Sequence, residues 1–395
     1  SKKYFSKKSL LQIGLLFNVG LLVYFKYMDF FISNTNSVLG SEIGLLHLAL
    51  PLAISFFTLQ QIAFLIDSYE GLVKEKNFLD YAIFVTFFPQ LIAGPIVHHK
   101  EMMPQFSSVN NKVKNHQNII LGLFIFSIGL FKKVVIADTF AIWATAGFDT
   151  ATALSLFEAW SASLSYTIQL YFDFSGYTDM AIGAALLFNI NLPINFNSPY
   201  KATGMIDFWQ RWHITLSSFI TTYIYTPIVR SFDKLTFHKA MFATVATFLI
   251  AGLWHGASWM FVMFGGLHGL GLITNHYWKK RKRKLNKFLA WFITFNFVNI
   301  TFVFFRAKEW DDAIKVLRGM INFDMPMYFD TIQLIYIGLF FVMILFRNSN
   351  EIIKLKLSKN ITLLITSFLL VISMLQLTNI LIQTDKISEF LYFNF

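Results

Sequence analysis

The chain has 395 residues, of which 55% are hydrophobic and only 14% charged, and its mean hydropathy is +0.54. Soluble globular domains carry about 25% charged residues, so this composition excludes an ordinary water-soluble domain and indicates a bilayer as the solvent. The net charge of +11 would suit a nucleic-acid partner, but the basic residues cluster between apolar segments, as the positive-inside rule expects of cytoplasmic loops.

We therefore predict one all-α, polytopic transmembrane domain over residues 1–395, surrounded by membrane lipid and without a nucleic-acid partner. The first residues, Ser1 to Tyr4, lead from lysines into a long apolar segment, which we interpret as a spanning helix and not as a cleavable signal peptide. The sequence contains no cysteine, which excludes disulfides, thiolate metal sites and a cysteine-linked acyl intermediate.

A helix that spans the bilayer needs about 20 predominantly apolar residues. The windows that roughly meet this length are, in chain order, 10–32, 43–66, 80–97, 119–137, 154–170, 238–254, 259–277, 288–305, 332–345 and 361–382. Three further segments, 140–146, 178–188 and 217–229, are short, interrupted or amphipathic. The pattern predicts about ten or eleven membrane segments, some of them re-entrant.

Three basic groups are candidates for the cytoplasmic side of the membrane. They are Lys132-Lys133, the run 279–287, and the trio Lys354, Lys356 and Lys359. The run 279–287 is the strongest candidate, because the orientation rule applies best to dense positive charge in a short loop. The sequence has no visible internal repeat, which argues against an inverted-repeat transporter.

Polar residues inside apolar segments are costly in a bilayer, so each is a functional candidate. The first such place ends in His98 and His99, shortly after a Gly94-Pro95 pair that breaks a helix. We interpret these histidines as interfacial residues at a helix end. A metal pair is disfavoured, since adjacent residues on a helix point in different directions, and we expect no metal site elsewhere.

The second place is the stretch 171–179. It holds Asp173, Ser175, Tyr177 and Asp179 between apolar residues. The two carboxylates are six residues apart, and Gly176 permits a break in the helix between them. The stretch lacks the Gly-x-Ser-x-Gly elbow of serine hydrolases, because an aspartate and not a glycine stands two residues before the serine. A structural polar network and a functional site both remain open as explanations.

The third place, 207–217, interleaves aromatic and basic side chains, among them Trp209, Arg211 and Trp212. This composition is typical of an interfacial or re-entrant segment. The histidine that follows, His213, could act as a ligand, as a base or as an interfacial hydrogen-bonding residue.

The fourth place is Trp254-His255-Gly256, at the junction of two strongly apolar segments. Gly256 allows backbone or substrate to come close. A neutral imidazole at this junction could serve as a general base, and the alternative is a buried histidine that forms hydrogen bonds between helices. His268, in the next apolar segment, is interpreted as a packing or hydrogen-bonding residue.

Several of these stretches occur in an order that resembles the membrane-bound O-acyltransferase family. The chain is most similar to the branch with the alginate O-acetyltransferase membrane subunit and the peptidoglycan O-acetyltransferase. The segments are FPQLIAGP at 88–95, YFDFSGYTDMAIG at 171–183, NFNSPY at 195–200, DFWQRWHITLS at 207–217, GLWHG at 252–256, FFRA at 304–307 and YFNF at 392–395. One such motif would be weak evidence, but the ordered set covers nearly the whole chain and is highly specific.

The resemblance implies a helical fold that encloses a tunnel, with re-entrant segments and the catalytic site at mid-membrane depth. The near-invariant histidine of the family corresponds to His255, and the second family position, on a re-entrant segment, corresponds to His213. Residues expected beside the substrates are Asp173, Ser175, Tyr177, Asp179, Trp209, Arg211, Trp212 and Trp254.

The sequence departs from the family in two respects. It has Thr221-Thr222 where relatives commonly carry an Arg-Asp pair, so no role is assigned to those charges here. Relatives also begin with further apolar helices before the segment at Leu10, so we expect N-terminal helices of the family to be missing from this sequence.

The resemblance also implies an activity, which is transfer of an acyl group, expected to be acetyl, from a cytoplasmic thioester to a hydroxyl outside the cytoplasm. Acetyl-CoA or another acyl thioester would be the donor substrate, and no bound cofactor is expected. The implied location is the bacterial inner membrane. The implied partners are an extracytoplasmic SGNH-type acetyltransferase or esterase and, downstream, a polysaccharide such as alginate or peptidoglycan. Relatives that transfer D-alanine toward teichoic acid form an open sub-class.

Two other classes compete with the transferase. A transporter or channel could use Asp173, Asp179 and the histidines as a proton or solute path. A scaffold that only anchors a soluble acetyltransferase is the third alternative. The missing repeats count against a transporter, and the Trp-His-Gly pattern counts for the transferase.

Overall fold

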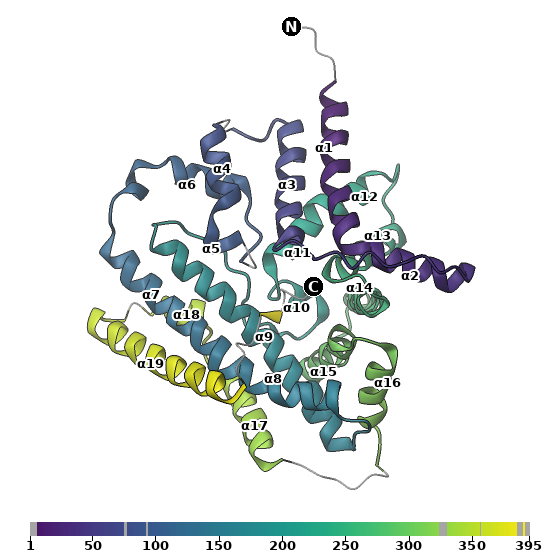
Figure 1. Cartoon of the computed structure of the whole chain (residues 1–395), viewed down its shortest axis with the longest axis vertical. Coiled ribbons are helices and arrows are strands. Elements are labelled where there is room, and N and C mark those ends of the chain that lie inside the picture. The colour runs from purple at the N-terminus through teal and green to yellow at the C-terminus, as the bar shows by residue number, and fades with distance from the viewer. Residues whose placement is uncertain are drawn as a thin grey trace.

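The computed structural model describes residues 6–74, 77–91, 94–323, 330–355, 357–384 and 390–391 of the chain. Within these residues all regular structure is helical, which confirms the predicted all-α class (Figure 1). Lys356 and the 392–395 segment of the resemblance lie outside the described residues.

The helices run in chain order as follows: α1 (Lys7–Leu22), η1 (Val23–Tyr27), α2 (Met28–Leu39), α3 (Ile54–Tyr69), α4 (Phe78–Thr86), α5 (Phe88–Leu91), α6 (His99–Ser107), η2 (Val109–Lys112), α7 (His116–Phe131), η3 (Lys132–Ala137), α8 (Asp138–Thr145), η4 (Ala146–Thr150), α9 (Leu156–Leu186), η5 (Pro199–Lys201), α10 (Met205–Trp209), α11 (Ile214–Ile220), η6 (Thr221–Tyr225), α12 (Thr226–Arg230), α13 (Phe237–His255), α14 (Trp259–Lys280), α15 (Lys287–Arg306), α16 (Trp310–Gly319), α17 (Thr331–Leu345), α18 (Ser349–Ile353) and α19 (Lys359–Thr384).

Five helical stretches in the described part of the chain are long and apolar enough to cross a bilayer. They are Lys7–Leu39, His116–Thr150, Phe237–His255, Lys287–Arg306 and Lys359–Ile382. The sequence predicted about twice as many segments. Window 43–66 is helical only from Ile54, and window 80–97 breaks into the short helices α4 and α5. A run of apolar residues therefore overestimates helix length where the chain bends inside the protein.

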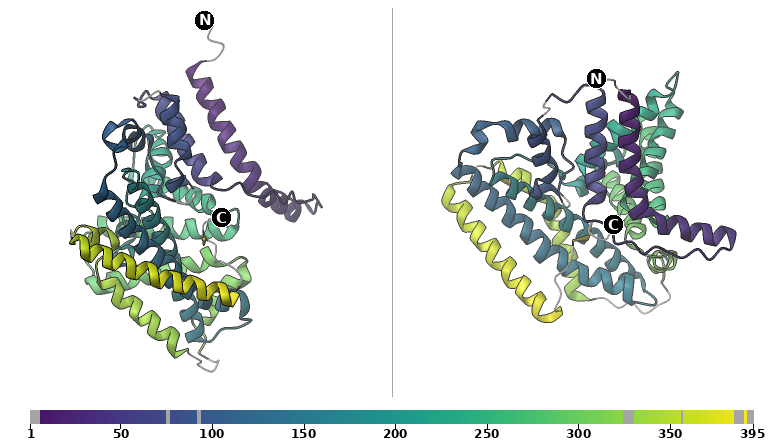
Figure 2. Two further views of the ribbon diagram at one scale, coloured as in Figure 1. Left: turned by 60° about the vertical axis from the view of Figure 1, so that its left-hand side comes forward. Right: turned by 45° about the horizontal axis from the view of Figure 1, so that its top comes forward.

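The longest helix, α9, lies in the middle of the molecule and packs against α7 and α8, with α19 outside α7 (Figures 1 and 2). It begins at a capping box in which Ser155 and Glu158 satisfy each other's backbone amides. It continues through Gly176, so the helix does not use the break that a glycine would permit there. A Cβ on Gly176 would lie 2.7 Å from the carbonyl oxygen of Gly129 in α7, so the glycine serves close helix packing and not a turn.

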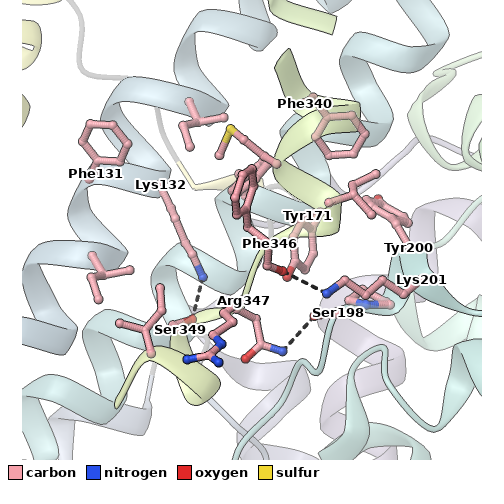
Figure 3. A pocket seen from close by; sticks show the side chains of 18 residues that line it. Phe131, Lys132, Tyr171, Ser198, Tyr200, Lys201, Phe340, Phe346, Arg347 and Ser349 are labelled. Carbon is pink, nitrogen blue, oxygen red and sulfur yellow. Dashed lines mark hydrogen bonds between the residues drawn. The ribbon is translucent and has the colours of Figure 1, made fainter. Parts of the chain in front are cut away.

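Lys132 and Lys133, candidates for the cytoplasmic side, are helical and do not form an exposed basic loop. They lie inside the continuous stretch from α7 to α8, with side chains 12% exposed. Lys132 Nζ is 2.7 Å from Asp179 Oδ2, and Lys133 Nζ is 2.7 Å from both Asp138 and Asp173. Lys132 also donates to Ser349 Oγ at 2.9 Å (Figure 3). A lysine can be buried here because a carboxylate neutralises it.

The loop 281–286 and its flanking lysines are exposed, as a solvated basic loop should be. It joins α14 to α15, and the start of α13 lies beside it, because Lys280 Nζ is 4.2 Å from the ring centroid of Phe237. Figures 1 and 2 show the segment leading into α13 near the N-terminal end of α1, which carries Lys7 and Lys8. Basic residues thus gather at one end of these helices, which supports that end as the cytoplasmic one.

Helices α13 and α14 form a hairpin with a very close backbone approach. A Cβ on Gly252 would lie 2.3 Å from the carbonyl oxygen of Phe261, and a Cβ on Gly265 would lie 2.3 Å from that of Phe248. In lipid the hydrophobic effect does not drive helices together. Small residues let the two backbones approach closely, so that van der Waals contacts hold the helices. The hairpin therefore sets where the end of α13 lies.

We predict that Gly265→Ala destabilises the protein, because its methyl group would overlap the Phe248 carbonyl and push the hairpin apart. Gly266→Ala is the matched control, since its Cβ would meet only Leu249 Cδ2 at 3.6 Å. The measurement is the melting temperature of each detergent-solubilised variant. Equal melting temperatures for the two variants would contradict the packing described here.

Candidate active site

His255 is the last residue of α13 and is 3% exposed. The helix ends there because Gly256 adopts extended backbone. The imidazole is enclosed by aromatic rings, with centroid distances of 5.0 Å to Trp254 and 5.1 Å to Phe305. A Cβ on residue 256 would lie 2.1 Å from the ring of Phe261, so the glycine leaves room for this ring beside the end of the helix.

His213 lies at the start of α11 and is fully buried. Its φ of +43° is left-handed, a conformation that non-glycine residues adopt rarely and mainly where surrounding structure enforces it. The segment before it is held by two backbone bonds, from Asn197 N–H to the Arg211 carbonyl and from Ile214 N–H to the Asn195 carbonyl. The 207–217 segment thus folds as two short helices joined by a turn, consistent with the re-entrant element expected from its composition.

One contact fixes the tautomer of His213. Its Nδ1 lies 3.2 Å from Asn195 Oδ1, which also accepts from the backbone N–H and the hydroxyl of Thr215. An amide oxygen can only accept, so the Nδ1 of His213 carries the hydrogen and the Nε2 of the neutral ring carries the lone pair. A neutral His213 in this tautomer accepts a hydrogen bond at Nε2, and it cannot donate one there to an oxyanion.

The two histidines share an aromatic enclosure. The ring centroid of Trp254 lies 6.4 Å from that of His213 and 5.0 Å from that of His255. Phe174 of α9 covers His213 edge-on at 4.7 Å. Residues from the re-entrant segment, from the end of α13 and from α9 therefore meet at one buried site.

Sequence reasoning missed the residue that holds the end of α13. Lys26 Nζ donates to the backbone carbonyls of Trp254 at 2.6 Å and His255 at 3.1 Å, and to Ser55 Oγ at 3.1 Å. The last carbonyls of a helix lack partners within the helix, and a cation there also interacts favourably with the helix dipole. A lysine in the middle of the apolar window 10–32 was the signal that could have identified it.

Two cavities approach this site from opposite ends of α1 and α3. The first, of about 300 Å³, is lined by His98, Glu101, Thr215, Ser218 and Tyr223, among others. It lies toward the end of α3 that carries Asp67, because Asp67 contacts both His98 and Tyr223.

The second cavity, of about 360 Å³, lies at the other end of α1. It is lined by Lys26, Asp29 and the segment 256–258 that directly follows His255, together with Tyr24, Phe25, Met28, Leu48, Leu50 and Phe261. One cavity thus borders the residues after His213, and the other borders the residues after His255.

The predicted substrate-binding residues separate into groups. On α9, Asp173 and Asp179 each lie 2.7 Å from a lysine, and Asp173 Oδ2 also accepts from the Leu391 backbone N–H at 3.1 Å. Tyr177 stacks on Phe390 at 4.6 Å, and Ser175 is buried. These contacts support a structural polar network, and within α9 it is Phe174 that contacts a histidine of the site.

The aromatic residues of the 207–217 segment mainly pack it in place. Trp209 Nε1 donates to His268 Nδ1 at 3.1 Å, so His268 is the hydrogen-bonding residue that was predicted. Arg211 pairs with Asp207 at 2.6 Å. Trp212 is buried among aromatic rings, with Phe208 stacked on it at 5.6 Å. Of the predicted group, Trp254 is the residue that contacts both histidines.

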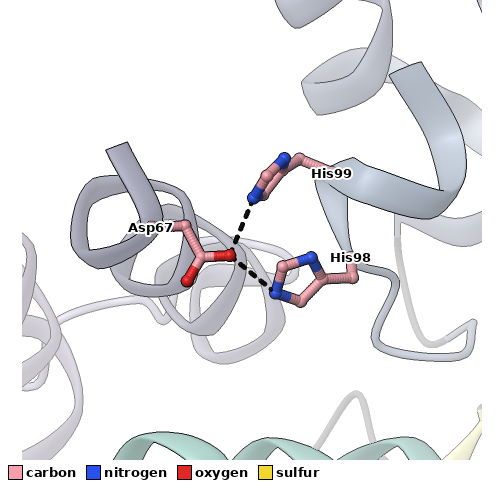
Figure 4. A group of neighbouring side chains, drawn as sticks. All are labelled: Asp67, His98 and His99. Carbon is pink, nitrogen blue, oxygen red and sulfur yellow. Dashed lines mark hydrogen bonds and ion pairs between the residues drawn. The ribbon is translucent and has the colours of Figure 1, made fainter. Parts of the chain in front are cut away.

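As adjacent residues of a helix, His98 and His99 are expected to point in different directions, but in the structure their rings point the same way. His98 is extended and precedes α6, so both rings turn toward Asp67, with Nε2–Oδ2 distances of 3.2 and 2.9 Å (Figure 4). These three groups could present ligand atoms to one metal ion. Lys100 Nζ also lies 3.2 Å from the same carboxylate oxygen, so the cluster already balances the charge of Asp67.

Comparison with known proteins gives a consistent result. The sequence model of the MBOAT, membrane-bound O-acyltransferase family matches residues 4–307, more than half of the chain. The chain is 54% identical over 346 residues to the peptidoglycan O-acetyltransferase of Helicobacter pylori, covering 80% of this chain and 65% of that protein. It is 35% identical over 322 residues to the probable alginate O-acetylase AlgI of Azotobacter vinelandii, covering 79% and 63%.

A more distant similarity is to the teichoic acid D-alanyltransferase of Streptococcus thermophilus, 27% identical over 281 residues, covering 64% of this chain and 68% of that protein. The chain thus spans less than two thirds of the length of the two more similar relatives. The family match covers both His213 and His255.

The ion pairs of α9 give a testable prediction. Lys132→Met should lower the melting temperature strongly, because it leaves Asp179 as a buried, uncompensated anion, a loss of about 3–5 kcal/mol for such pairs. Adding Asp179→Asn should restore much of that loss. The measurement is the melting temperature of the solubilised single and double variants. A double variant no more stable than Lys132→Met would show that the Lys132–Asp179 ion pair does not stabilise the fold.

Proposed function

This chain belongs to the membrane-bound O-acyltransferase family, and we propose that it transfers an acetyl group from a cytoplasmic thioester to a hydroxyl on the opposite side of the membrane, with His255 as general base. The observation that carries the proposal is the position of His255, a buried imidazole directly followed by the lining of one cavity, while a second cavity borders the residues after the neighbouring His213. A thioester and a hydroxyl could reach such a site from opposite faces without a water-filled path between them.

The distribution of exposed basic residues indicates which cavity faces which side of the membrane. The cavity beside His98 lies at the end of the molecule with the exposed basic residues of the N-terminal segment and of the 279–287 loop, the end that the positive-inside rule assigns to the cytoplasm. We assign this cavity to the donor thioester, which is acetyl-CoA or a related compound. The cavity beside Gly256 and Ser258 then receives the hydroxyl.

The chemistry requires a base, alignment and a leaving group. His255 removes the proton from the acceptor hydroxyl as its oxygen attacks the thioester carbonyl, and the new C–O bond forms while the C–S bond breaks. The proton then passes from His255 to the departing thiolate, so the enzyme returns to its starting state. Since the chain has no cysteine and no serine elbow, direct transfer within a ternary complex is the simplest route.

His213 has a positioning role in this scheme. Its Nε2 lone pair can accept a hydrogen bond from the acceptor hydroxyl or from the acyl donor, and Asn195 holds the ring in that tautomer. In this tautomer Nε2 carries no hydrogen, so a neutral His213 does not polarise the thioester carbonyl by donating to it. The indole N–H of Trp254 points to the Ser55 carbonyl at 3.4 Å, which makes it a poor candidate for an oxyanion donor.

The names of the relatives suggest the class of molecule that accepts the acetyl group. Two of them are named for peptidoglycan and for alginate, and we propose an extracytoplasmic polysaccharide as the final acceptor. An SGNH-type acetyltransferase or esterase would receive the acetyl group on the way. The location that follows is the bacterial inner membrane. A transporter is not favoured, because both carboxylates of its supposed path are paired with lysines.

We predict that His255→Ala lowers acetyl transfer by about 10²–10⁴-fold, the usual contribution of a general base. The measurement is radiolabelled acetyl transfer per correctly folded molecule, with a monodisperse detergent-solubilised peak as the folding criterion. His238→Ala is the matched control, since His238 lies at the other end of the same helix and bonds Tyr277 at 3.1 Å. Wild-type turnover by His255→Ala would remove this residue from the mechanism and favour a scaffold.

His213→Ala should also lower turnover, but less completely than His255→Ala, because it removes a positioning group and leaves the base in place. Activity is again divided by the amount of folded protein, since the unusual backbone of His213 makes a folding defect the competing explanation. A loss that only follows the amount of folded protein, with wild-type specific activity, would reduce His213 to a structural residue.

A further inference from the structure

A third cavity lies away from the histidines, between α7, α9 and the α17–α18 connection, and has a volume of about 200 Å³. Figure 3 shows its lining side chains converging from these elements and from η5. Most of its surface is apolar. The apolar lining residues are Ile128, Phe131, Ile136, Phe172, Phe340, Met343, Ile344, Phe346 and Ile352.

One edge of this cavity is cationic. Lys201 Nζ donates to the Phe346 carbonyl at 2.9 Å, a neutral acceptor that leaves its charge uncompensated. Arg347 is exposed and has no hydrogen bond or ion pair to the described part of the chain. The third cation, Lys132, is neutralised by Asp179. No carboxylate lines the cavity within the described residues, so two positive charges lie at the edge of an apolar surface.

The polar side chains at this edge are held in place and offer hydroxyl and amide groups. Asn348 Nδ2 donates to Ser198 Oγ at 2.8 Å, and Ser349 Oγ accepts from Lys132 at 2.9 Å (Figure 3). Glu351 is the nearest acid in the sequence, and it is used to cap α18 through the Asn348 N–H at 3.0 Å. The edge therefore suits an anion with several acceptor oxygens.

The cationic edge lies near the level of the basic loop. The chain just after Lys201 is tied to α14, because Ile206 N–H donates to Asn275 Oδ1 at 3.1 Å. Asn275 precedes Lys279 by about one helical turn. Apolar walls in the hydrocarbon and cations at headgroup level are the arrangement that an anionic lipid matches.

We propose that this cavity binds one anionic phospholipid, with its phosphate at Lys201 and Arg347 and an acyl chain along the apolar walls. The proposal does not depend on the catalytic assignment. It has a structural consequence, because the neighbouring Tyr200 donates to the Thr167 carbonyl at 2.6 Å and packs on Trp212 at 6.1 Å. The lipid would therefore support the segment that carries His213.

The test measures binding of phosphatidylglycerol and phosphatidylcholine to the purified full chain in a neutral detergent, by native mass spectrometry. We expect the wild type to prefer phosphatidylglycerol. The Lys201→Gln/Arg347→Gln variant should lose about 30-fold in affinity for it, as expected from two juxtamembrane cations. The matched control is Lys354→Gln/Lys359→Gln, which removes two exposed cations outside the cavity and should bind like the wild type.

Three results would overturn the proposal. The first is a wild type that binds both lipids equally. The second is a control variant that loses as much affinity as the cavity variant, since the effect would then come from net charge alone. The third is displacement of phosphatidylglycerol by coenzyme A or inorganic phosphate at concentrations that do not displace phosphatidylcholine. This result would assign the cations to a soluble anion. A monodisperse peak for each variant confirms that folded protein is compared.

Discussion

The cost of burying polar groups in a membrane protein determines most of this structure. Charged and polar side chains at depth are retained only where partners compensate for lost water. Asp173 and Asp179 occur with Lys133 and Lys132, each at 2.7 Å. Irregular backbone follows the same rule, since the re-entrant segment is enclosed by protein and not by lipid. Two of the buried carboxylates are therefore held in ion pairs within aromatic packing.

The same constraint explains how His255 is held in the protein interior. The end of α13 exposes carbonyl groups that a bilayer could not satisfy, and Lys26 supplies donors to two of them. Gly256 then turns the chain away from the helix and lines one of the two cavities. Asn195 holds the neighbouring His213 through its Nδ1. The positions of the two histidines thus follow from completing hydrogen bonds at a helix end and at a turn.

Sequence reasoning predicted the helical class, the family, and His213 and His255 as the residues to examine, because composition and ordered motifs carry that information. It could not predict that Gly176 packs two helices together, since a glycine permits both a turn and a close contact. It did not predict the ion pairs of Lys132 and Lys133 with Asp179 and Asp173, because these carboxylates lie some 40 residues further along the chain. The role of Lys26 likewise depends on a contact with residues 228 and 229 positions away.

The central claim is that the histidine site is approached by separate cavities from opposite sides of the membrane. The absence of cysteine allows a direct measurement with single-cysteine variants at Ser218 and Ser258, one in each cavity. Cells carrying each variant are treated with a membrane-impermeant thiol reagent, before and after they are opened. The account predicts that Ser258→Cys reacts in intact cells and Ser218→Cys only in opened cells. Labelling of both from the same side would contradict it.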